Sequence, residues 1–312
     1  MANTDQTPTA SVKERNALQN FGYNIVRSKH LYAMIAPWFI LFTAFTVFPV
    51  LFSMAMSFTN FNALQSPQWV GAGNYRDLIL NDEIFLSAVQ NTFLLAIIIG
   101  PIGYMLSFMM AWILNEFHRV LRTILTVILY APSLAGTAVT VWTLIFSSDS
   151  TGYLNALLID WGVINEPILW LQDERYMMMI IIIVNLWMAF GIAFLSFIAG
   201  LQGLDRSQLE AAEIDGVRSR WQELWYVVLP SMRPQLMFGA VMTISGSLAI
   251  SGSALTGFPS TGYATHTIID HVSDYGILRF ELGYASAITV ILFLVMIFVN
   301  LLVQKFLRGV GQ

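Results

Sequence analysis

The chain alternates between long apolar runs and shorter polar stretches, and six of the apolar runs are long enough to cross a lipid bilayer. A membrane-spanning helix needs about 20 mostly apolar residues. Because a helix satisfies its own backbone hydrogen bonds, this pattern predicts an all-α, polytopic membrane bundle. The six predicted transmembrane helices lie near residues 31–56, 89–114, 121–146, 176–200, 235–257 and 284–306.

The composition agrees with a membrane protein. The chain is 56% hydrophobic and 11% charged, whereas soluble domains are about 25% charged. It contains no cysteine, which excludes a disulfide framework and a thiolate metal site. We predict a polar cytoplasmic tail at residues 1–30 and one transmembrane domain at residues 31–312, with no room for a second soluble domain.

The placement of Lys and Arg predicts the orientation in the membrane. With the amino terminus inside, twelve of the 15 basic residues fall in cytoplasmic segments and three fall outside. Both termini are then cytoplasmic. Arg122 and Lys305 lie at the cytoplasmic ends of two predicted spans, and no other Asp, Glu, Lys or Arg lies inside a span, so a proton or sodium relay has no obvious carrier. The three basic residues predicted outside are Arg76, Arg175 and Arg279.

Residues 207–234 form the one long polar, amphipathic segment between apolar runs, and the predicted orientation makes it cytoplasmic. Ser207 and Glu210 have the spacing of a capping box at a helix start. Gly216 is a natural helix stop. The pattern predicts a first short helix that is too short and too charged to cross a bilayer.

A second short helix is predicted after this glycine. Ser219 and Gln222 repeat the capping-box spacing, and Pro230 disfavours helix at the residue before it. The apolar residues between them have the i, i+3, i+4, i+7 spacing of one helical face. They are Trp221, Leu224, Trp225 and Val228.

The residue patterns of catalysis and metal binding are missing from the sequence. It has no Walker-type phosphate loop and only three lysines, so we expect no nucleotide hydrolysis by this chain. Glu210, Glu213 and Asp215 lack an accompanying nucleophile and are interpreted as part of a solvated helix. We expect no metal site and no nucleic-acid partner. The histidines lack metal-ligand spacing and favour loop or interface roles; they are His30, His118, His266 and His271.

Small residues recur at every fourth position of the fifth predicted span, from Ser245 to Gly257. Such a stripe allows close helix packing, and its hydroxyl groups can also line a polar pathway for a neutral solute. Packing is the favoured interpretation for each individual serine. With other polar and aromatic residues of the spans, the candidate substrate-pathway residues are Tyr104, Asn185, Trp187, Ser247 and Ser251.

The predicted outside loops, near residues 58–88, 147–175 and 258–283, are longer than simple hairpins need. They have mixed turn and apolar signals that allow short interfacial helices, with GYLN at residues 152–155 as a helix start. Closure of the bundle and docking of an external protein are both open interpretations.

The polar segment resembles the EAA loop of the membrane subunits of binding-protein-dependent ABC importers. The matching residues are Glu210, Ala211, Ala212, Asp215, Gly216, Leu229 and Pro230. Further motifs resemble the carbohydrate branch, with its maltose-type permeases: SFTNF at 57–61, WVGAGNYRDL at 69–78, NT at 91–92, GYLN at 152–155 and GYASA at 283–287. The resemblance covers the chain from about residue 31 to its end.

This resemblance implies the type I ABC importer permease fold and a prokaryotic, multi-pass inner-membrane protein. The loop would form a coupling helix that docks on an ATP-binding subunit, with the small Ala211 and Ala212 at the contact. The implied partners are a second permease subunit, two ATP-binding subunits and an external solute-binding protein, with a sugar or oligosaccharide as substrate. ATP and Mg²⁺ would belong to the ATP-binding subunits, and this chain would bind no cofactor and catalyse no reaction.

One departure from the family pattern is visible. Twelve residues, Val217 to Val228, separate Gly216 from the Leu-Pro pair, one more than is usual in the family. One extra residue rotates a continuing helix by about 100°. We expect the turn at residues 217–219 to absorb it.

Three alternatives differ from the sugar importer. An ion-coupled secondary carrier would make residues 207–234 an ordinary linker, but the spans lack the buried carboxylate that ion coupling usually needs. A membrane scaffold or regulatory subunit would leave transport to another protein. An importer of a non-sugar neutral solute would share all the features above.

Overall fold

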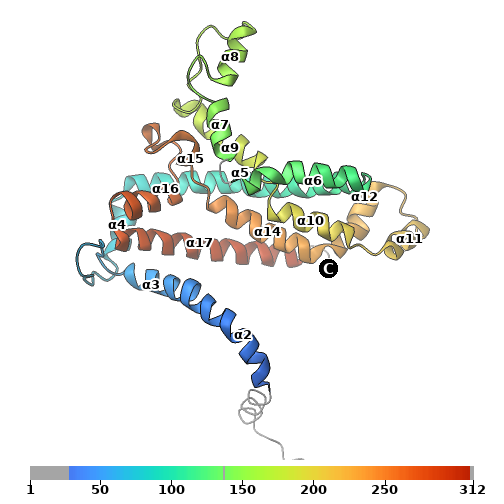
Figure 1. Cartoon of the computed structure of the whole chain (residues 1–312), viewed down its shortest axis with the longest axis horizontal. Helices are drawn as coiled ribbons and strands as arrows, with labels where there is room; N and C mark the ends of the chain where they lie inside the picture. Colours follow the sequence, from blue (N-terminus) through green and yellow to red (C-terminus); the bar gives the residue numbers. More distant parts are fainter. Residues whose placement is uncertain (1–27, 136–137, 310–312) are drawn as a thin grey trace, which may run out of the picture. The chain divides into compact units, whose positions relative to one another are not determined.

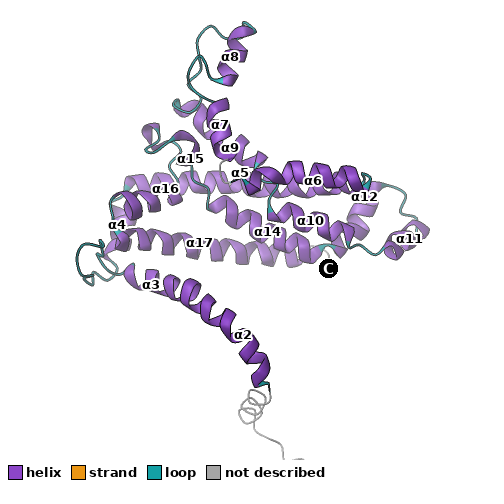
Figure 2. Cartoon of the chain, in the orientation of Figure 1, coloured by secondary structure: helices purple, strands orange, loops and turns teal. Residues whose placement is uncertain are grey.

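The computed structural model describes residues 28–135 and 138–309, apart from the side chains of Arg206 and of residues 307–309. This part of the chain is helical (Figure 2), and the one extended pairing among the described residues is an isolated bridge between Thr59 and Trp69. The predicted tail, residues 1–30, lies almost wholly outside the described residues. The chain divides into two compact units, Met1–Ala55 and Met56–Gln312.

The described part of the first unit is a single helical run that ends at the boundary with the second unit. It comprises α2 (Lys29–Phe42), a π-helical turn η1 (Thr43–Val47) and α3 (Phe48–Met56). The π turn ends two residues before Pro49. A proline ring clashes with the carbonyl four residues earlier in a regular α-helix, so a wider turn at this point relieves that contact.

The second unit is a helical bundle in which α5 (Glu83–Asn115), α10 (Ile192–Gln202) and α14 (Arg233–Leu248) pack against one another (Figure 1). The carboxyl-terminal helix α17 (Leu282–Gly309) packs against α14. The other elements are α4 (Gly73–Leu80), α6 (Arg119–Leu134), α7 (Ala138–Ile145), α8 (Tyr153–Asp160), α9 (Glu174–Trp187), α11 (Arg206–Ile214), α12 (Arg220–Glu223), η2 (Leu224–Val228), α13 (Leu229–Ser231), α15 (Ser253–Thr256), η3 (Thr261–Tyr263), α16 (Ile268–Ser273) and η4 (Asp274–Leu278).

Small residues allow the close approach of α10 and α14. A Cβ atom added to Gly239 would lie 2.3 Å from Cζ of Phe197, and one added to Gly200 would lie 2.9 Å from Cε of Met232. Because lipid-embedded helices associate through tight packing and not through exclusion of water, such contacts carry much of the helix association.

Four helical runs are long and apolar enough to span a membrane, and two bent helix pairs raise the number to six if each pair counts as one span. The four runs coincide with four of the six predicted spans. The third predicted span, 121–146, corresponds to α6 and α7, which are separate helices. The four runs are Lys29–Met56, Glu83–Asn115, Glu174–Gln202 and Leu282–Phe306.

The fifth predicted span, 235–257, is wrong at its carboxyl end. Helix α14 ends at Leu248, and the chain turns before the short helix α15. The residues spaced four apart from Ser245 to Gly257 therefore do not form one helical stripe. The fourth span is also interrupted, because α9 and α10 are separated by residues 188–191.

Several sequence motifs contact one another in one hydrogen-bonded joint beside α4 and the start of α17. The Asn74 side chain donates hydrogen bonds to the backbone carbonyl groups of Ser57 and Thr59, at 2.8 and 2.9 Å. The N–H of Gly283 donates to the carbonyl of Phe61 at 2.8 Å, and a Cβ on this glycine would lie 2.1 Å from the Thr59 oxygen. SFTNF, GNYRDL and GYASA are therefore parts of one structural joint.

Candidate coupling segment and translocation pathway

The first helix of the 207–234 segment is α11, and its amino-terminal cap is Asp205. The Asp205 carboxylate accepts a hydrogen bond from the Ser207 N–H at 3.0 Å. This bond holds the pKa of Asp205 below its ordinary value. The predicted capping box of Ser207 and Glu210 is wrong, because the side chain of Asp205, two residues before Ser207, caps the helix instead.

The end of α11 at Gly216 is confirmed, and its geometry explains why glycine stands there. Gly216 has a φ of +97°, which side chains with a Cβ rarely adopt. The Val217 N–H donates to the carbonyl of Ala212 at 3.0 Å, and the Gly216 N–H donates to that of Glu213 at 3.2 Å. These two bonds form a Schellman motif, which satisfies carbonyl groups at the helix end.

The second capping box is confirmed at α12. The Gln222 side-chain oxygen accepts hydrogen bonds from the N–H groups of Arg218 and Ser219, at 3.1 and 3.2 Å. The Ser219 hydroxyl caps the new helix in return. The helix continues through Pro230 and ends at Ser231, so the predicted end of the second helix at this proline is one residue too early.

A π-helical turn, η2, precedes Pro230 as η1 precedes Pro49, and the proline is again the second residue after the turn. The Leu229 N–H donates to the carbonyl of Leu224, five residues earlier. A π turn accommodates one residue more than an α turn. The one extra residue between Gly216 and Leu229 is therefore accommodated in η2. The prediction had placed it in the turn at residues 217–219.

The predicted apolar face of the second helix is only half correct. Leu224 and Val228 are buried, whereas Trp221 and Trp225 are mostly exposed. The π turn changes which residues share a face. The buried pair belongs to a hydrophobic cluster with residues of α5, α10 and the start of α14, which we call the base cluster. It consists of Phe108, Ala111, Leu114, Ala193, Phe194, Phe197, Ile198, Leu201, Leu224, Val228 and Met232.

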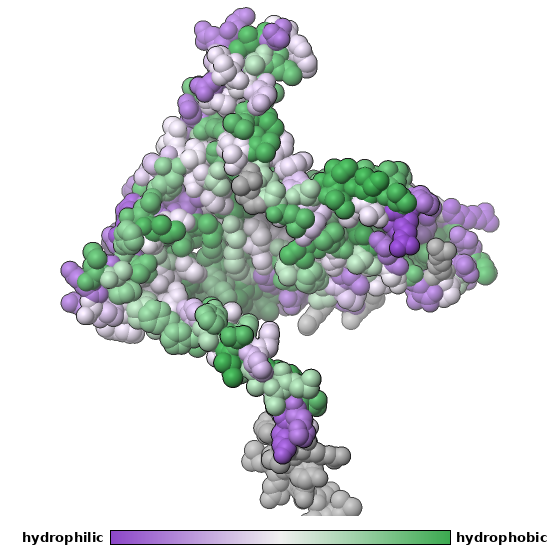
Figure 3. Space-filling view, viewed as in Figure 1, coloured by the Kyte–Doolittle hydropathy of each residue, from purple (hydrophilic) through white to green (hydrophobic). Residues whose placement is uncertain are grey.

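The residues of α11 that resemble the EAA loop lie at the surface, whereas Leu229 packs against the base cluster. Glu210, Ala211 and Asp215 are exposed, and Ala212 is partly buried. Ile214 is 87% exposed, which is unusual for a large apolar side chain. Figure 3 shows hydrophilic side chains gathered at the end that carries α11 and α12, and hydrophobic ones over α6. Helix α11 thus exposes small and apolar side chains at an otherwise polar end of the second unit.

The candidate pathway residues do not form one group. The Ser247 hydroxyl donates to the carbonyl of Ile244 and faces Gly100 on α5, so Ser247 is a packing residue. The Asn185 amide donates to the carbonyl of Ile181 in its own helix at 2.8 Å. The Tyr104 hydroxyl donates to the carbonyl of Leu236 on α14 at 3.3 Å.

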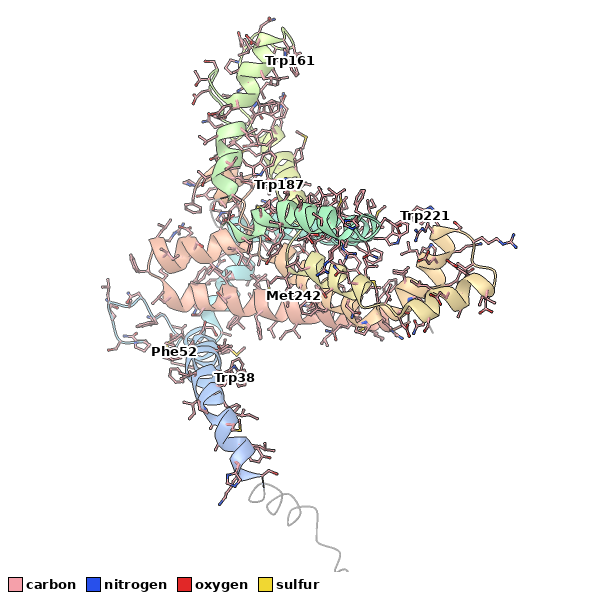
Figure 4. All side chains as sticks on the ribbon, turned by 45° about the vertical axis from the view of Figure 1, so that its right-hand side comes forward. Trp38, Phe52, Trp161, Trp187, Trp221 and Met242 are labelled. Carbon is pink, nitrogen blue, oxygen red and sulfur yellow. The ribbon has the colours of Figure 1, made fainter. Side chains whose placement is uncertain are left out.

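Trp187 lies at the end of α9, next to the interruption of the fourth span (Figure 4). Its ring packs edge to face against that of Trp142 on α7, with the ring centroids 5.2 Å apart. The Trp142 indole nitrogen is buried, and no acceptor lies near it in the described structure. Trp142 also contacts Phe146, which contacts Trp170, which in turn contacts Tyr176.

Ser251 belongs to a buried polar group that the sequence did not predict. The Asp270 carboxylate, 1% exposed, accepts hydrogen bonds from the hydroxyls of Ser251 and Ser253, at 2.5 and 2.6 Å. It also accepts from the Thr267 hydroxyl and from the N–H groups of Gly252, Ser253 and Thr267. One available signal was the capping-box spacing of Thr267 and Asp270, which the structure uses.

A second carboxylate, Asp82, joins the start of α5 to α16, η4 and α17. It accepts hydrogen bonds from Phe85 N–H at 2.8 Å, from the Tyr284 hydroxyl at 3.0 Å and from the Tyr275 hydroxyl at 3.3 Å. His271 Nε2 lies 3.1 Å from Oδ2, the oxygen that accepts from the two tyrosines, while Phe85 donates to Oδ1. Burial raises the pKa of Asp82, but these bonds and His271 outweigh it and hold that pKa below its ordinary value.

His266 and His271, which we assigned to loop or interface roles, are both buried. His266 Nε2 lies 3.0 Å from His271 Nδ1. Burial lowers the pKa of both rings, so both are neutral near pH 7. In the neutral state His271 donates to Asp82 and accepts from His266. We call Asp82, His266, Asp270 and His271, with their partners, the polar cluster.

Within residues 28–135 and 138–309, no group of three or more His, Cys, Asp or Glu side chains is arranged to hold a metal ion. In the polar cluster, backbone N–H groups and side-chain groups both donate hydrogen bonds to the two carboxylates. Asn91 and Thr92 of α5 add to it, since Asn91 donates to the carbonyl of His266 at 2.9 Å and Thr92 accepts from the Ile268 N–H at 2.9 Å.

An apolar bundle with interrupted spans, and with one polar segment packed against its base cluster, is the arrangement of a polytopic membrane protein. The comparisons with known proteins agree. The sequence model of the family described as "Binding-protein-dependent transport system inner membrane component" matches residues 103–312. The chain belongs to this family.

Curated relatives cover nearly the whole chain. It is 31% identical to the probable ABC transporter permease protein YesP of Bacillus subtilis, over 88% of this chain and 89% of the relative. It is 26% identical to AraP, the arabinooligosaccharides transport system permease protein of the same organism, over 96% of this chain and 94% of the relative. It is 28% identical to the lactose transport system permease protein LacF of Rhizobium radiobacter, over 82% and 86%.

The fold is shared with a solved structure. A chain of a bacterial ABC transporter involved in the import of the acidic polysaccharide alginate superposes with a TM-score of 0.77. The match covers 94% of this chain and 100% of that one, at 23% sequence identity.

Proposed function

We propose that this chain is one of two permease subunits of an ATP-dependent, binding-protein-dependent importer of a sugar or oligosaccharide. It would cross the prokaryotic inner membrane six times, with both termini in the cytoplasm. The family membership and the sugar-transport relatives AraP and LacF support this proposal. ATP hydrolysis, with its Mg²⁺, belongs in this proposal to two partner subunits.

The observation that carries the coupling role is the position of α11 beside the base cluster. Helix α11 contacts η2, whose Leu224 and Val228 are buried against α5 and α10. The Ser231 hydroxyl, just beyond η2, donates to the Gln208 side chain of α11 at 3.2 Å. A force applied to α11 would therefore reach two packed spans through a close-packed cluster, which moves as a body and does not compress.

In this proposal Glu210, Ala211, Ala212, Asp215, Gly216, Leu229 and Pro230 form the coupling site for the ATP-binding subunit. Small side chains permit close docking, and the exposed Ile214 supplies apolar surface. Movement of that subunit would tilt the spans and change which side of the pathway is open. A solute-binding protein would deliver the substrate from outside, as a complex of the alginate transporter with a periplasmic protein illustrates for that system.

For the pathway, Trp187 and Trp142 are the strongest candidates. Aromatic faces and an unpaired indole N–H suit the apolar ring faces and hydroxyl groups of a sugar. Tyr104 and Asn185 stay weaker candidates because each side chain already has a backbone partner. A non-sugar solute is the second candidate function, because the relative UgpA, 27% identical, is named for sn-glycerol-3-phosphate transport.

The test is uptake of a labelled oligosaccharide panel, with sn-glycerol-3-phosphate included, into proteoliposomes that hold the complete complex. We expect uptake that requires both enclosed ATP and the binding protein. Uptake driven by an ion gradient without ATP would refute the importer.

The coupling role is tested separately with Ala212→Arg. A bulky charge at the docking face should abolish retention of the ATP-binding subunits on the tagged permease and should abolish ATP-dependent uptake. Ala156→Arg, at an exposed alanine of α8, is the matched control and should leave retention unchanged. Normal retention and uptake with Ala212→Arg would contradict the coupling role.

A further inference from the structure

The helical run Arg220–Ser231 lies across the direction of the spans. It comprises α12, η2 and α13, and it makes an angle of 81° with α14, which follows directly. Helix α14 packs along α5 and α17, two of the runs that are long enough to cross a membrane. Because α14 packs against these two spans, a segment turned by 81° from α14 runs across the bundle and not along it (Figure 1).

The two faces of this run differ sharply. Leu224 and Val228 are 6% and 3% exposed, in the base cluster. Trp225 and Tyr226 are 62% and 73% exposed. A face that meets only water normally carries charged residues, whereas Trp and Tyr combine an apolar ring with one polar atom and prefer the boundary between lipid and water.

The level of this run along the spans is fixed by a ring contact. The ring of Trp221, labelled in Figure 4, has its centroid 5.3 Å from that of Trp112, which lies near the end of α5. Helix α5 has 33 residues and is therefore about 50 Å long. A bilayer with its headgroup regions measures about 40–45 Å. Trp112 is only three residues from the end of α5, so Trp221 lies at the headgroup level.

Charged residues mark the same level. Arg220 pairs with Glu116, which directly follows α5, at 2.8 Å. The Arg122 guanidinium, in the first turns of α6, donates to the Asn115 side chain at 3.0 Å. Charges of this density are unfavourable in hydrocarbon but favourable among headgroups.

We propose that Arg220–Ser231 is a membrane-surface anchor, whose Trp225 and Tyr226 side chains lie among the lipid headgroups of the bilayer. Phe238 and Met242 of α14, the helix that follows this run, are also exposed. The anchor would fix the base of α11 relative to the membrane. The inference depends on the membrane spans and not on the substrate or the coupling role.

The absence of cysteine makes this chain suited to site-directed spin labelling. The variants Trp225→Cys and Tyr226→Cys change exposed side chains and therefore leave the base cluster intact. Each is labelled with a nitroxide in the full chain, assembled with cysteine-free partner subunits in liposomes. Collision rates with oxygen, which concentrates in lipid, and with a water-soluble nickel chelate give the depth of each label. Asp160→Cys, at an exposed position of α8, is the aqueous control, and Leu294→Cys on α17 is the hydrocarbon control.

We expect both test labels to show a ratio of oxygen to nickel collisions between those of the two controls, close to the phosphate level. A ratio equal to that of Asp160→Cys would overturn the anchor, because the face would then be in water. Labels shielded from both reagents would overturn it too, because a partner protein and not lipid would then cover the face. Retention of the partner subunits on each variant shows that the complex has assembled.

Discussion

The 207–234 segment and the polar cluster are two polar regions of this apolar chain, and they are built in opposite ways. In the segment, the hydrogen bonds of the second helix cap join residues at most four positions apart, in exposed backbone. In the polar cluster, Asp82 and His271 are 189 positions apart and largely buried. Local bonds stabilise one helix end at a time, whereas long-range buried bonds join several helices and fail together.

The largest effect is expected for Asp270→Ala in the polar cluster. The change removes the acceptor of six hydrogen bonds and leaves buried donors without a partner. Hydrogen bonds to a charged group contribute about 1.5–3 kcal/mol each, so the loss in unfolding free energy should exceed about 3 kcal/mol. Thermal melting of the purified protein in detergent measures it.

The matched control is Asp160→Ala, at an exposed position of α8, which should melt like the wild type. An Asp270→Ala variant with an unchanged melting temperature would show that the cluster does not hold the helices together.

An intermediate effect is expected for Gly239→Ala, in the packing that supports the coupling segment. The new Cβ would lie 2.3 Å from the Phe197 ring and force α10 and α14 apart. Overpacking of this kind costs about 1–3 kcal/mol. Both the melting temperature and ATP-dependent uptake should fall.

Gly246→Ala in the same helix is the control, because nothing lies within 4 Å of a Cβ there. Its stability should be equal to or slightly above that of the wild type, since alanine favours helix more than glycine. Equal losses in both variants would indicate a general intolerance of α14 and not a specific contact.

A smaller, pH-dependent effect should distinguish the two regions. Because burial lowers the pKa of His266 and His271, the folded state binds protons less readily than the unfolded state. The stability they contribute is complete above about pH 6.5, the ordinary histidine value, and falls as the pH decreases through their lowered pKa values. Asp82, Asp270, Asp274 and Arg279 are the charged groups that act on these two rings.

Melting temperatures between pH 7.5 and 5 measure this loss. The double variant His266→Asn, His271→Asn should start from a lower stability and show a flatter pH dependence. His118→Asn, at an exposed histidine outside the cluster, should keep the slope of the wild type. Identical slopes in all three proteins would contradict the assignment.

The smallest effect is expected for Ser219→Ala in the 207–234 segment. Loss of a helix cap costs about 1 kcal/mol, and here only the first turn of α12 depends on it. Hydrogen exchange at the amides of residues 221–223 should accelerate, while the global melting temperature stays within error. Ser207→Ala is the control, because Asp205 and not Ser207 caps α11. Faster exchange in α11 of the control would reinstate Ser207 as a cap.

The sequence by itself determined the features that depend on the solvent or on near neighbours. Long apolar runs predicted the positions of four of the spans, because only helices satisfy the backbone in lipid. Gly216 predicted a helix end, because its positive φ is a property of one residue. The capping box at Ser219 was equally local.

Only the tertiary structure decided where α14 ends and which serines are available to a solute. After Leu248 the apolar pattern continues, but Gly252 packs against the Thr265 backbone so closely that a Cβ would lie 1.8 Å from its oxygen. Asp270 accepts hydrogen bonds from the N–H groups of Gly252 and Ser253, which in a longer α14 would donate to carbonyl groups of that helix. These partners lie 17 and 18 positions away along the chain, and periodicity contains no information on contacts of that range.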